Sequence, residues 1–191
     1  MPKTTVLEKP AYLGLLNAIS LGESAAGEYL DAWAEVTPSP DLAATLRLVA
    51  ARERSHGDVF RRRIAELGYS LRDKTDPRAA ERLAKLADPG ISDLDKIPPR
   101  GEEAGDPFAD IRRRLAEGEF DPMTANLMNW YIAEEKDSGR RLNEAYACVR
   151  EAARPGVAGV LSADAEAIMA CMSQGFERLE KAIEKLAKAR K

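Results

Sequence analysis

The only histidine of this 191-residue chain, His56, follows Glu53 by three residues. In a helix this spacing places both side chains on the same face, where an imidazole nitrogen and a carboxylate oxygen can hold one metal ion. Two more glutamates, Glu23 and Glu135, have comparable settings elsewhere in the chain. The chemistry open to these four residues together is the binding of Fe, Mn or Zn, which all accept oxygen and imidazole ligands.

Each of the four residues interrupts an apolar row whose members are spaced alternately three and four apart. This spacing is typical of a helix face buried in a bundle. The three rows are Leu16, Ile19, Glu23, Ala26, Leu30 and Trp33; Leu42, Leu46, Val49, Glu53, His56, Phe60, Ile64 and Leu67; and Met128, Tyr131, Glu135, Ser138, Leu142, Ala145 and Val149. Glu134 lies about 100° around its helix from the third row, so Glu135 is the residue expected to face the interior.

Three carboxylates that converge on one axis need a positive charge or protons to offset their negative charge. A carboxylate buried without a partner costs several kcal/mol or changes its pKa, and a metal ion would remove that cost. The alternative is that Glu53 and His56 form a hydrogen-bonded core pair without metal. Tyr131, one turn before Glu135, is expected to be a core aromatic rather than a hydrogen-bond donor to the site.

The elements that must position these residues are predicted to be helices, because the chain is rich in Ala, Leu, Glu, Arg and Lys and shows no sustained period-two alternation. Proline residues mark several helix starts. The predicted long helices span residues 10–36, 40–67, 122–154 and 162–189. The crossover 68–120 contains two shorter predicted helices, 76–87 and 106–118, with a polar loop rich in Pro and Gly predicted between them. Two hairpins joined by one long crossover predict a single all-α domain over residues 1–191, with the connectivity of a ferritin-like four-helix bundle.

Composition excludes several function classes. The 32 acidic and 29 basic residues leave a net charge of −3, which gives no electrostatic reason to expect nucleic acid. No apolar run approaches the roughly 18 residues of a membrane helix, and the first ten residues lack the apolar region of a secretion signal. Cys148 and Cys171 have no zinc-type spacing and are interpreted as buried free thiols. A cytoplasmic location is expected.

Two stretches, LGESAAGEY around Glu23 and AARERSHGDVF around Glu53 and His56, resemble the helix 1 and helix 2 signatures of the rubrerythrin-like branch of the ferritin-like superfamily. The resemblance covers the four long helices. It implies two similar helical hairpins, each of which supplies one glutamate and one Glu-x-x-His. Together, two such hairpins hold two metal ions.

The second half of that pattern is degenerate in this chain. Segment 133–145 resembles 21–33, with Glu135 in the place of Glu23, but the last helix has Met172 and Gly175 where the second Glu-x-x-His would stand. A thioether is a poor ligand for hard Fe or Mn. A complete di-iron site is therefore not expected.

The site that remains is predicted to hold one Fe or Mn ion, or Zn, per chain. Its ligands would be Glu23, Glu53 and His56. Glu135 is expected either as a fourth ligand or as the carboxylate of a weak second position.

The resemblance implies oxygen-, peroxide- or iron-linked redox chemistry, which would make the protein a metal-dependent oxidoreductase. No rubredoxin-like cysteine pairs are present to pass electrons to the site. Reaction with a small oxidant would therefore need an external electron donor. A homodimer is expected by analogy with the fold. The alternative, favoured by the altered last helix, is a metal-free bundle that acts as a structural or protein-interaction module.

Overall fold

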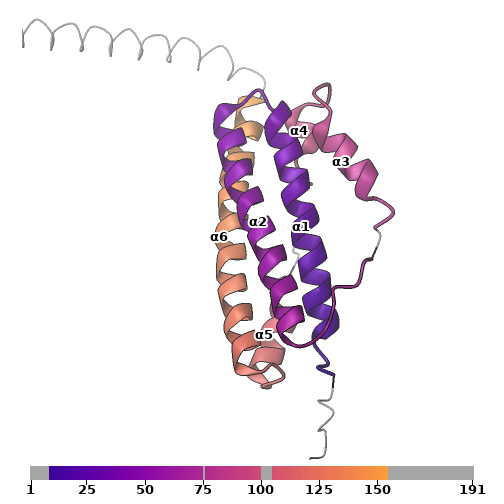
Figure 1. Ribbon diagram of the computed structural model, residues 1–191. Coiled ribbons are helices and arrows are strands. Elements are labelled where there is room, and N and C mark those ends of the chain that lie inside the picture. Colours follow the sequence, from indigo (N-terminus) through magenta and orange to yellow (C-terminus); the bar gives the residue numbers. More distant parts are fainter. Residues whose placement is uncertain (1–8, 75, 100–104, 155–191) are drawn as a thin grey trace, which may run out of the picture. The chain divides into compact units, whose positions relative to one another are not determined.

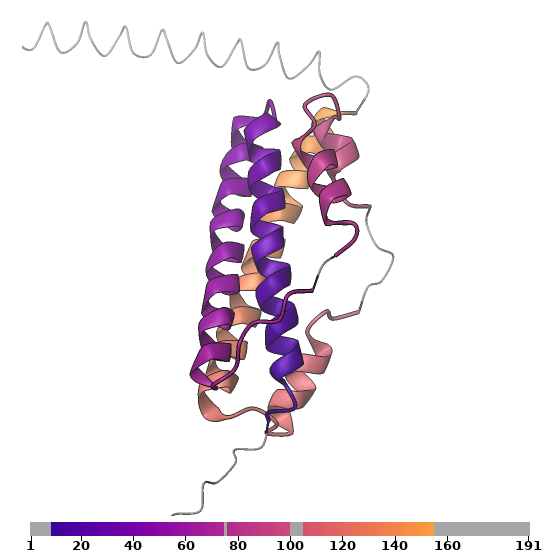
Figure 2. The ribbon, with the colours of Figure 1, turned by 45° about the vertical axis from the view of Figure 1, so that its right-hand side comes forward.

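The computed structural model describes residues 9–74, 76–99 and 105–154. Over these residues the chain is all-α and contains no strands. Three long helices lie side by side (Figure 1 and Figure 2): α1 (Leu13–Val36), α2 (Pro40–Glu66) and α6 (Pro122–Ala152). The segment between α2 and α6 contains three short helices: α3 (Ala79–Ala87), α4 (Asp93–Lys96) and α5 (Ala109–Ala116).

The chain divides into two compact units, residues 1–147 and 148–191. Of the second unit the structure describes only residues 148–154, so the packing and the site below belong to the first unit. The predicted helix 162–189, with Met172 and Gly175, lies outside the described residues. The fourth helix of a ferritin-like bundle and the single domain over residues 1–191 therefore stay predictions.

Capping residues explain where the long helices begin and end. The Ser39 hydroxyl accepts a hydrogen bond from the Leu42 N–H at 3.3 Å, and Pro40 occupies the first turn of α2. Gly68, with φ of 83°, follows the end of α2. Asp121 caps α6 and accepts hydrogen bonds from the N–H groups of Met123 and Thr124 at 3.0 and 3.2 Å. The observed bounds of these three helices lie within three residues of the predicted ones.

The crossover differs from the prediction in one element. The predicted helices 76–87 and 106–118 are present as α3 and α5, each beginning three residues later than expected. The four-residue helix α4 was predicted to be loop. Its Ser92 cap accepts a hydrogen bond from the Asp95 N–H at 3.2 Å, but four residues are too few to show a helical period.

The α1–α2 contact is close because glycine stands at two crossing points. A Cβ on Gly57 would lie 2.3 Å from Ser24 Oγ and 3.1 Å from the Ser20 carbonyl oxygen. A Cβ on Gly27 would lie 3.0 Å from the Ala50 carbonyl oxygen. The Ser20 hydroxyl also donates to the Gly57 carbonyl at 2.8 Å. The two backbones are thus held at a spacing that a larger side chain would not allow.

Ion pairs and hydrogen bonds join α2 to α6. Arg52 donates to Asp137 at 2.7 Å, and Arg63 donates to Asp121 and to the Thr124 hydroxyl at 2.7 and 2.9 Å. Together with the α1–α2 contact, these bonds join α2 to both other long helices.

The described residues bear on two expectations from the sequence: the burial of the cysteines and the lack of a membrane helix. Cys148 is exposed, so its interpretation as a buried thiol was wrong, while Cys171 lies outside the described residues. None of the described helices combines the length and the apolarity that a membrane crossing requires.

Candidate metal centre

All four residues singled out from the sequence meet in the middle of the bundle. Glu23 comes from α1, Glu53 and His56 come from α2, and Glu135 comes from α6. One side-chain nitrogen or oxygen of each lies within 4.8 Å of the corresponding atom of every other. The predicted convergence of a carboxylate and imidazole group is confirmed. That this group binds metal stays a prediction.

His56 is the centre of the group. Its side chain is fully buried, and Nδ1 lies 3.1 Å from a Glu135 oxygen, 3.7 Å from a Glu53 oxygen and 3.9 Å from a Glu23 oxygen. Within the described part of the chain, Nδ1 and the nearest Glu135 oxygen are both buried without a hydrogen-bond partner. Three carboxylates therefore surround one ring nitrogen that no hydrogen bond from the described residues satisfies.

The other ring nitrogen of His56 faces Glu134. Nε2 lies 2.9 Å from Glu134 Oε2, a distance at which Nε2–H donates to the carboxylate. When the ring is neutral and Nε2 carries the proton, the lone pair of Nδ1 points at the three carboxylates. A histidine that binds metal has the same arrangement, because the ring N–H opposite the metal is usually donated to a carboxylate.

The sequence reasoning missed Glu134, because that residue lies off the buried row. Glu134 nevertheless reaches the site, because the His56 ring extends from α2 to α6. There, the adjacent residues Glu134 and Glu135 contact its two nitrogens. The pair Glu134-Glu135 was the signal available in the sequence.

Two aromatic residues of α6 hold the imidazole plane. Trp130 and Tyr131 both meet the His56 ring edge-on, with ring centroids 5.0 and 5.3 Å away. The Tyr131 hydroxyl also donates to Glu23 Oε1 at 2.6 Å. The expectation that Tyr131 is only a core aromatic was therefore wrong: its ring is buried, and its hydroxyl orients a carboxylate of the site.

The pKa values of the group reflect burial and mutual charge. Burial raises the pKa of Glu53 to about 8, and the charges of Glu135 and Glu23 act in the same direction. Burial alone would lower the pKa of His56, but the surrounding carboxylates, Glu135 first, favour the protonated ring and raise that pKa to about 12. Burial opposes ionisation of Glu23 as well, yet the neighbouring His56 and Glu53 and the hydrogen bond from the Tyr131 hydroxyl lower the pKa of Glu23. Burial and mutual charge therefore favour a protonated Glu53 and a protonated His56 in the metal-free group.

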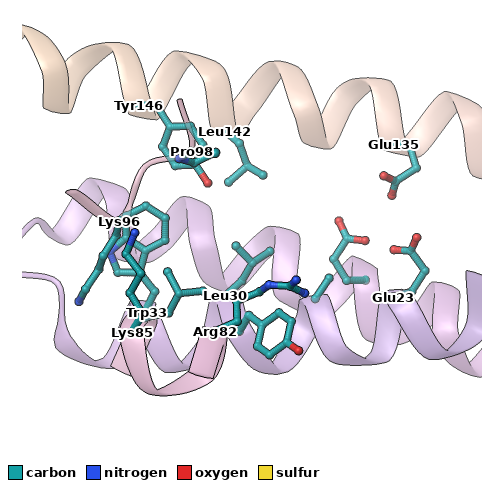
Figure 3. A pocket seen from close by; sticks show the side chains of 14 residues that line it. Glu23, Leu30, Trp33, Arg82, Lys85, Lys96, Pro98, Glu135, Leu142 and Tyr146 are labelled. Atoms are coloured by element: carbon teal, nitrogen blue, oxygen red, sulfur yellow. The ribbon is translucent and has the colours of Figure 1, made fainter. Parts of the chain in front are cut away.

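A pocket of about 510 Å³ lies next to the cluster of glutamates. Glu23, Glu53 and Glu135 all line it. Figure 3 shows Glu23 and Glu135 at one end of this pocket, with their carboxylates directed toward each other across the space between α1 and α6. A small molecule in the pocket would meet the three carboxylates directly.

No family model, curated protein or solved structure matches this chain. What the geometry establishes is an all-α protein with a buried Glu/His group that could hold a metal ion. The resemblance to rubrerythrin-like proteins rests on the residues around Glu23, Glu53 and His56 alone.

Proposed function

We propose that this chain is a ferritin-like, rubrerythrin-like metalloprotein that binds one Fe or Mn ion, or Zn, through Glu23, Glu53, His56 and Glu135. One observation carries the proposal. The buried Nδ1 of His56 lacks a hydrogen-bond partner among the described residues and faces three carboxylates, while Glu134 holds Nε2. A metal ion bound to Nδ1 would satisfy that nitrogen and neutralise the carboxylates at the same time.

The residues fit such an ion in chemistry and in size. Carboxylate oxygen and imidazole nitrogen are ligands that Fe, Mn and Zn all accept. Ligands on opposite sides of one ion, each at about 2.1 Å, stand about 4.2 Å apart. The four ligand atoms already lie within 4.8 Å of one another, so binding requires only a small contraction of side chains.

The surrounding residues would each support the ion's chemistry. When bound, Fe or Mn would supply electrons to dioxygen or peroxide. Glu134 keeps the proton of His56 on Nε2, and Tyr131 holds Glu23 in place through its hydroxyl. The pocket gives a small oxidant access to the carboxylates. A cytoplasmic location, a homodimer and an external electron donor belong to the same proposal and rest on the sequence.

A metal-free bundle with a structural or interaction role is the second candidate. Its support is the pKa of His56, which is raised to about 12. A protonated His56 would itself supply a positive charge to the carboxylates. In that case the group is a buried ionic core, and metal ions would neither bind nor stabilise the protein.

Oxidant consumption separates the two candidates. The full chain, purified without a histidine tag, is loaded anaerobically with Fe(II) or Mn(II), and the loss of dioxygen or hydrogen peroxide is then followed. The proposal predicts consumption above that of free metal ions, with His56→Ala at the free-metal baseline. Equal rates for the wild-type protein and His56→Ala would refute the redox role.

A further inference from the structure

The pocket beside the metal centre has opposite charges at its two ends. Figure 3 shows the carboxylates of Glu23 and Glu135 at one end and Lys96 at the other, with Leu30 and Leu142 between them. Lys85 and Arg82 add positive charge to the lining. The Arg82 guanidinium already has partners: it forms an ion pair with Asp76 at 3.5 Å and lies over the ring of Tyr29.

Lys96 is the unusual residue of this pocket. It is only 5% exposed, and within the described ranges its ammonium group has no hydrogen-bond or ion-pair partner. Lys96 Nζ is not among the fully buried side-chain atoms that lack a partner, so solvent reaches the ammonium group from the pocket. An anion in the pocket would pair with it there, because the ammonium group supplies three hydrogen-bond donors.

The position of Lys96 is fixed by contacts distant in sequence. Asp93, in the same short helix α4, accepts a hydrogen bond from the Trp33 indole and another from the Thr37 hydroxyl, both at 2.6 Å. Ser92 caps the same helix. These bonds attach α4 to the end of α1, which places the lysine beside the pocket rather than in solvent.

The apolar lining of the pocket favours a ligand whose remaining part is also apolar. Most of the lining between the charged ends is apolar or aromatic: Ala26, Leu30, Trp33, Leu86, Leu142 and Tyr146. A small inorganic anion would leave these walls uncovered, and a neutral apolar molecule would leave Lys96 unpaired. A volume of about 510 Å³ is within the range of small-molecule sites.

We propose that this pocket binds a small amphipathic carboxylate, an apolar chain or ring that ends in one carboxylate group. Its carboxylate pairs with Lys96, and its apolar part passes Leu30 and Leu142 toward Glu23 and Glu135. The opposite orientation is disfavoured, because it would bring the ligand's charge against like charges of the protein. That the far end of the ligand meets a metal rests on the proposed function; binding of the ligand does not.

Isothermal titration calorimetry of the full chain tests the inference with three ligands of equal chain length. Decanoate is expected to bind with one site per chain. Decanol, which lacks the charge, is expected to bind at least roughly tenfold more weakly than decanoate. This loss is typical of a charged hydrogen bond. Decyltrimethylammonium can place its charge only against Glu23 and Glu135, in the reverse orientation, so any binding of this ligand is expected not to depend on Lys96. Absence of decanoate binding, or equal affinity for decanoate and decanol, would overturn the proposal.

A charge-removing variant tests the role assigned to the lysine. Lys96→Met keeps the apolar stem, and is expected to weaken decanoate binding roughly tenfold while leaving decanol binding unchanged. Lys136→Met, at an exposed position of α6, is the matched control and is expected to bind decanoate like the wild type. Equal losses in the two variants would overturn the assignment to Lys96. The ligand series on the wild-type chain stays decisive if Lys96→Met does not fold.

The same titration on metal-free protein separates this inference from the proposed function. Binding of decanoate by a chain that takes up no metal would support the pocket and refute the metal centre. Uptake of metal without binding of decanoate, before or after loading, would refute the pocket and leave the metal centre standing.

Discussion

Glu134 and Glu135, neighbours in α6, contact the two ring nitrogens of His56: Glu134 Oε2 lies 2.9 Å from Nε2, and Glu135 Oε1 lies 3.1 Å from Nδ1. The contacts differ in kind. The first is a hydrogen bond, whereas the second joins two buried atoms that lack hydrogen-bond partners among the described residues. Glu134 therefore positions the ring, and Glu135 belongs to the group that would hold an ion.

Removing the hydrogen bond to Nε2 should weaken metal binding without abolishing it. We predict that Glu134→Ala lowers the affinity for Fe(II) or Mn(II) by about 10- to 100-fold, the usual effect of losing the carboxylate behind a ligating histidine. Glu134→Gln should lose less, because its amide oxygen still accepts from Nε2–H. Competition with a chromophoric chelator measures both affinities. An unchanged affinity in Glu134→Ala would show that Glu134 does not support the site.

The Tyr131 hydroxyl should stabilise the bundle through Glu23. Tyr131→Phe removes a 2.6 Å hydrogen bond to a carboxylate that is mostly buried. The expected loss is about 1–3 kcal/mol in the free energy of unfolding, measured in urea. Tyr69→Phe is the control, because the Tyr69 hydroxyl has no hydrogen bond among the described residues, and its effect should stay within about 0.5 kcal/mol. Similar losses in both variants would argue against a special role for Tyr131.

The spacing between α1 and α2 should depend on Gly57. A methyl group there meets Ser24 Oγ at 2.3 Å and two backbone atoms at 3.1 Å, so Gly57→Ala should destabilise the fold by about 1–3 kcal/mol. Gly22→Ala, in α1 with none of the described residues within 4 Å of the new Cβ, should instead stabilise the fold by about 0.5–1 kcal/mol through helix propensity. Thermal unfolding distinguishes the two signs, and stabilisation by Gly57→Ala would contradict the close contact.

The Asp121 cap should make stability depend on pH. Burial would raise the pKa of Asp121, but hydrogen bonds from Thr124, Tyr12 and Arg63 hold that pKa well below its usual range. A carboxylate with a depressed folded-state pKa stabilises the fold above its unfolded pKa of about 3.9, and that contribution is lost as pH falls below this value.

The corresponding variant, Asp121→Asn, should lower the free energy of unfolding at pH 7 by about 1–2 kcal/mol, the range for a lost cap and a charged hydrogen bond. Urea unfolding from pH 7 down to pH 3.5 should show the difference from the wild type shrinking below about pH 4. Asp58→Asn, which alters one exposed ion pair, should have little effect at any pH. A pH-independent difference for Asp121→Asn would contradict the ionised cap.

The helices and the ligand row could be predicted because both follow from local rules. Proline and capping residues mark the starts of α2 and α6, and a buried helix face has a fixed period. That period was enough to place Glu23, Glu53, His56 and Glu135 on one axis.

The remaining features depend on contacts that no local pattern encodes. Glu134 lies 2.9 Å from a residue that is 78 positions away in sequence, His56. The hydroxyl of Tyr131 finds a partner on α1, 108 residues away in sequence. Lys96 reaches the pocket because Asp93 pairs with Trp33, 60 residues away. Such pairings are fixed by the packing of whole helices, so the sequence predicted the carboxylate group but not its supporting bonds or the pocket.

Metal content per chain tests the central claim most directly. The untagged full chain and His56→Ala are loaded anaerobically with Fe(II) or Mn(II), freed of unbound metal, and measured by elemental mass spectrometry. The account predicts about one ion per wild-type chain and none in His56→Ala, because that change removes the imidazole ligand while the three glutamates remain. No metal in the wild-type chain, or equal metal in both proteins, would contradict a metal centre built on His56.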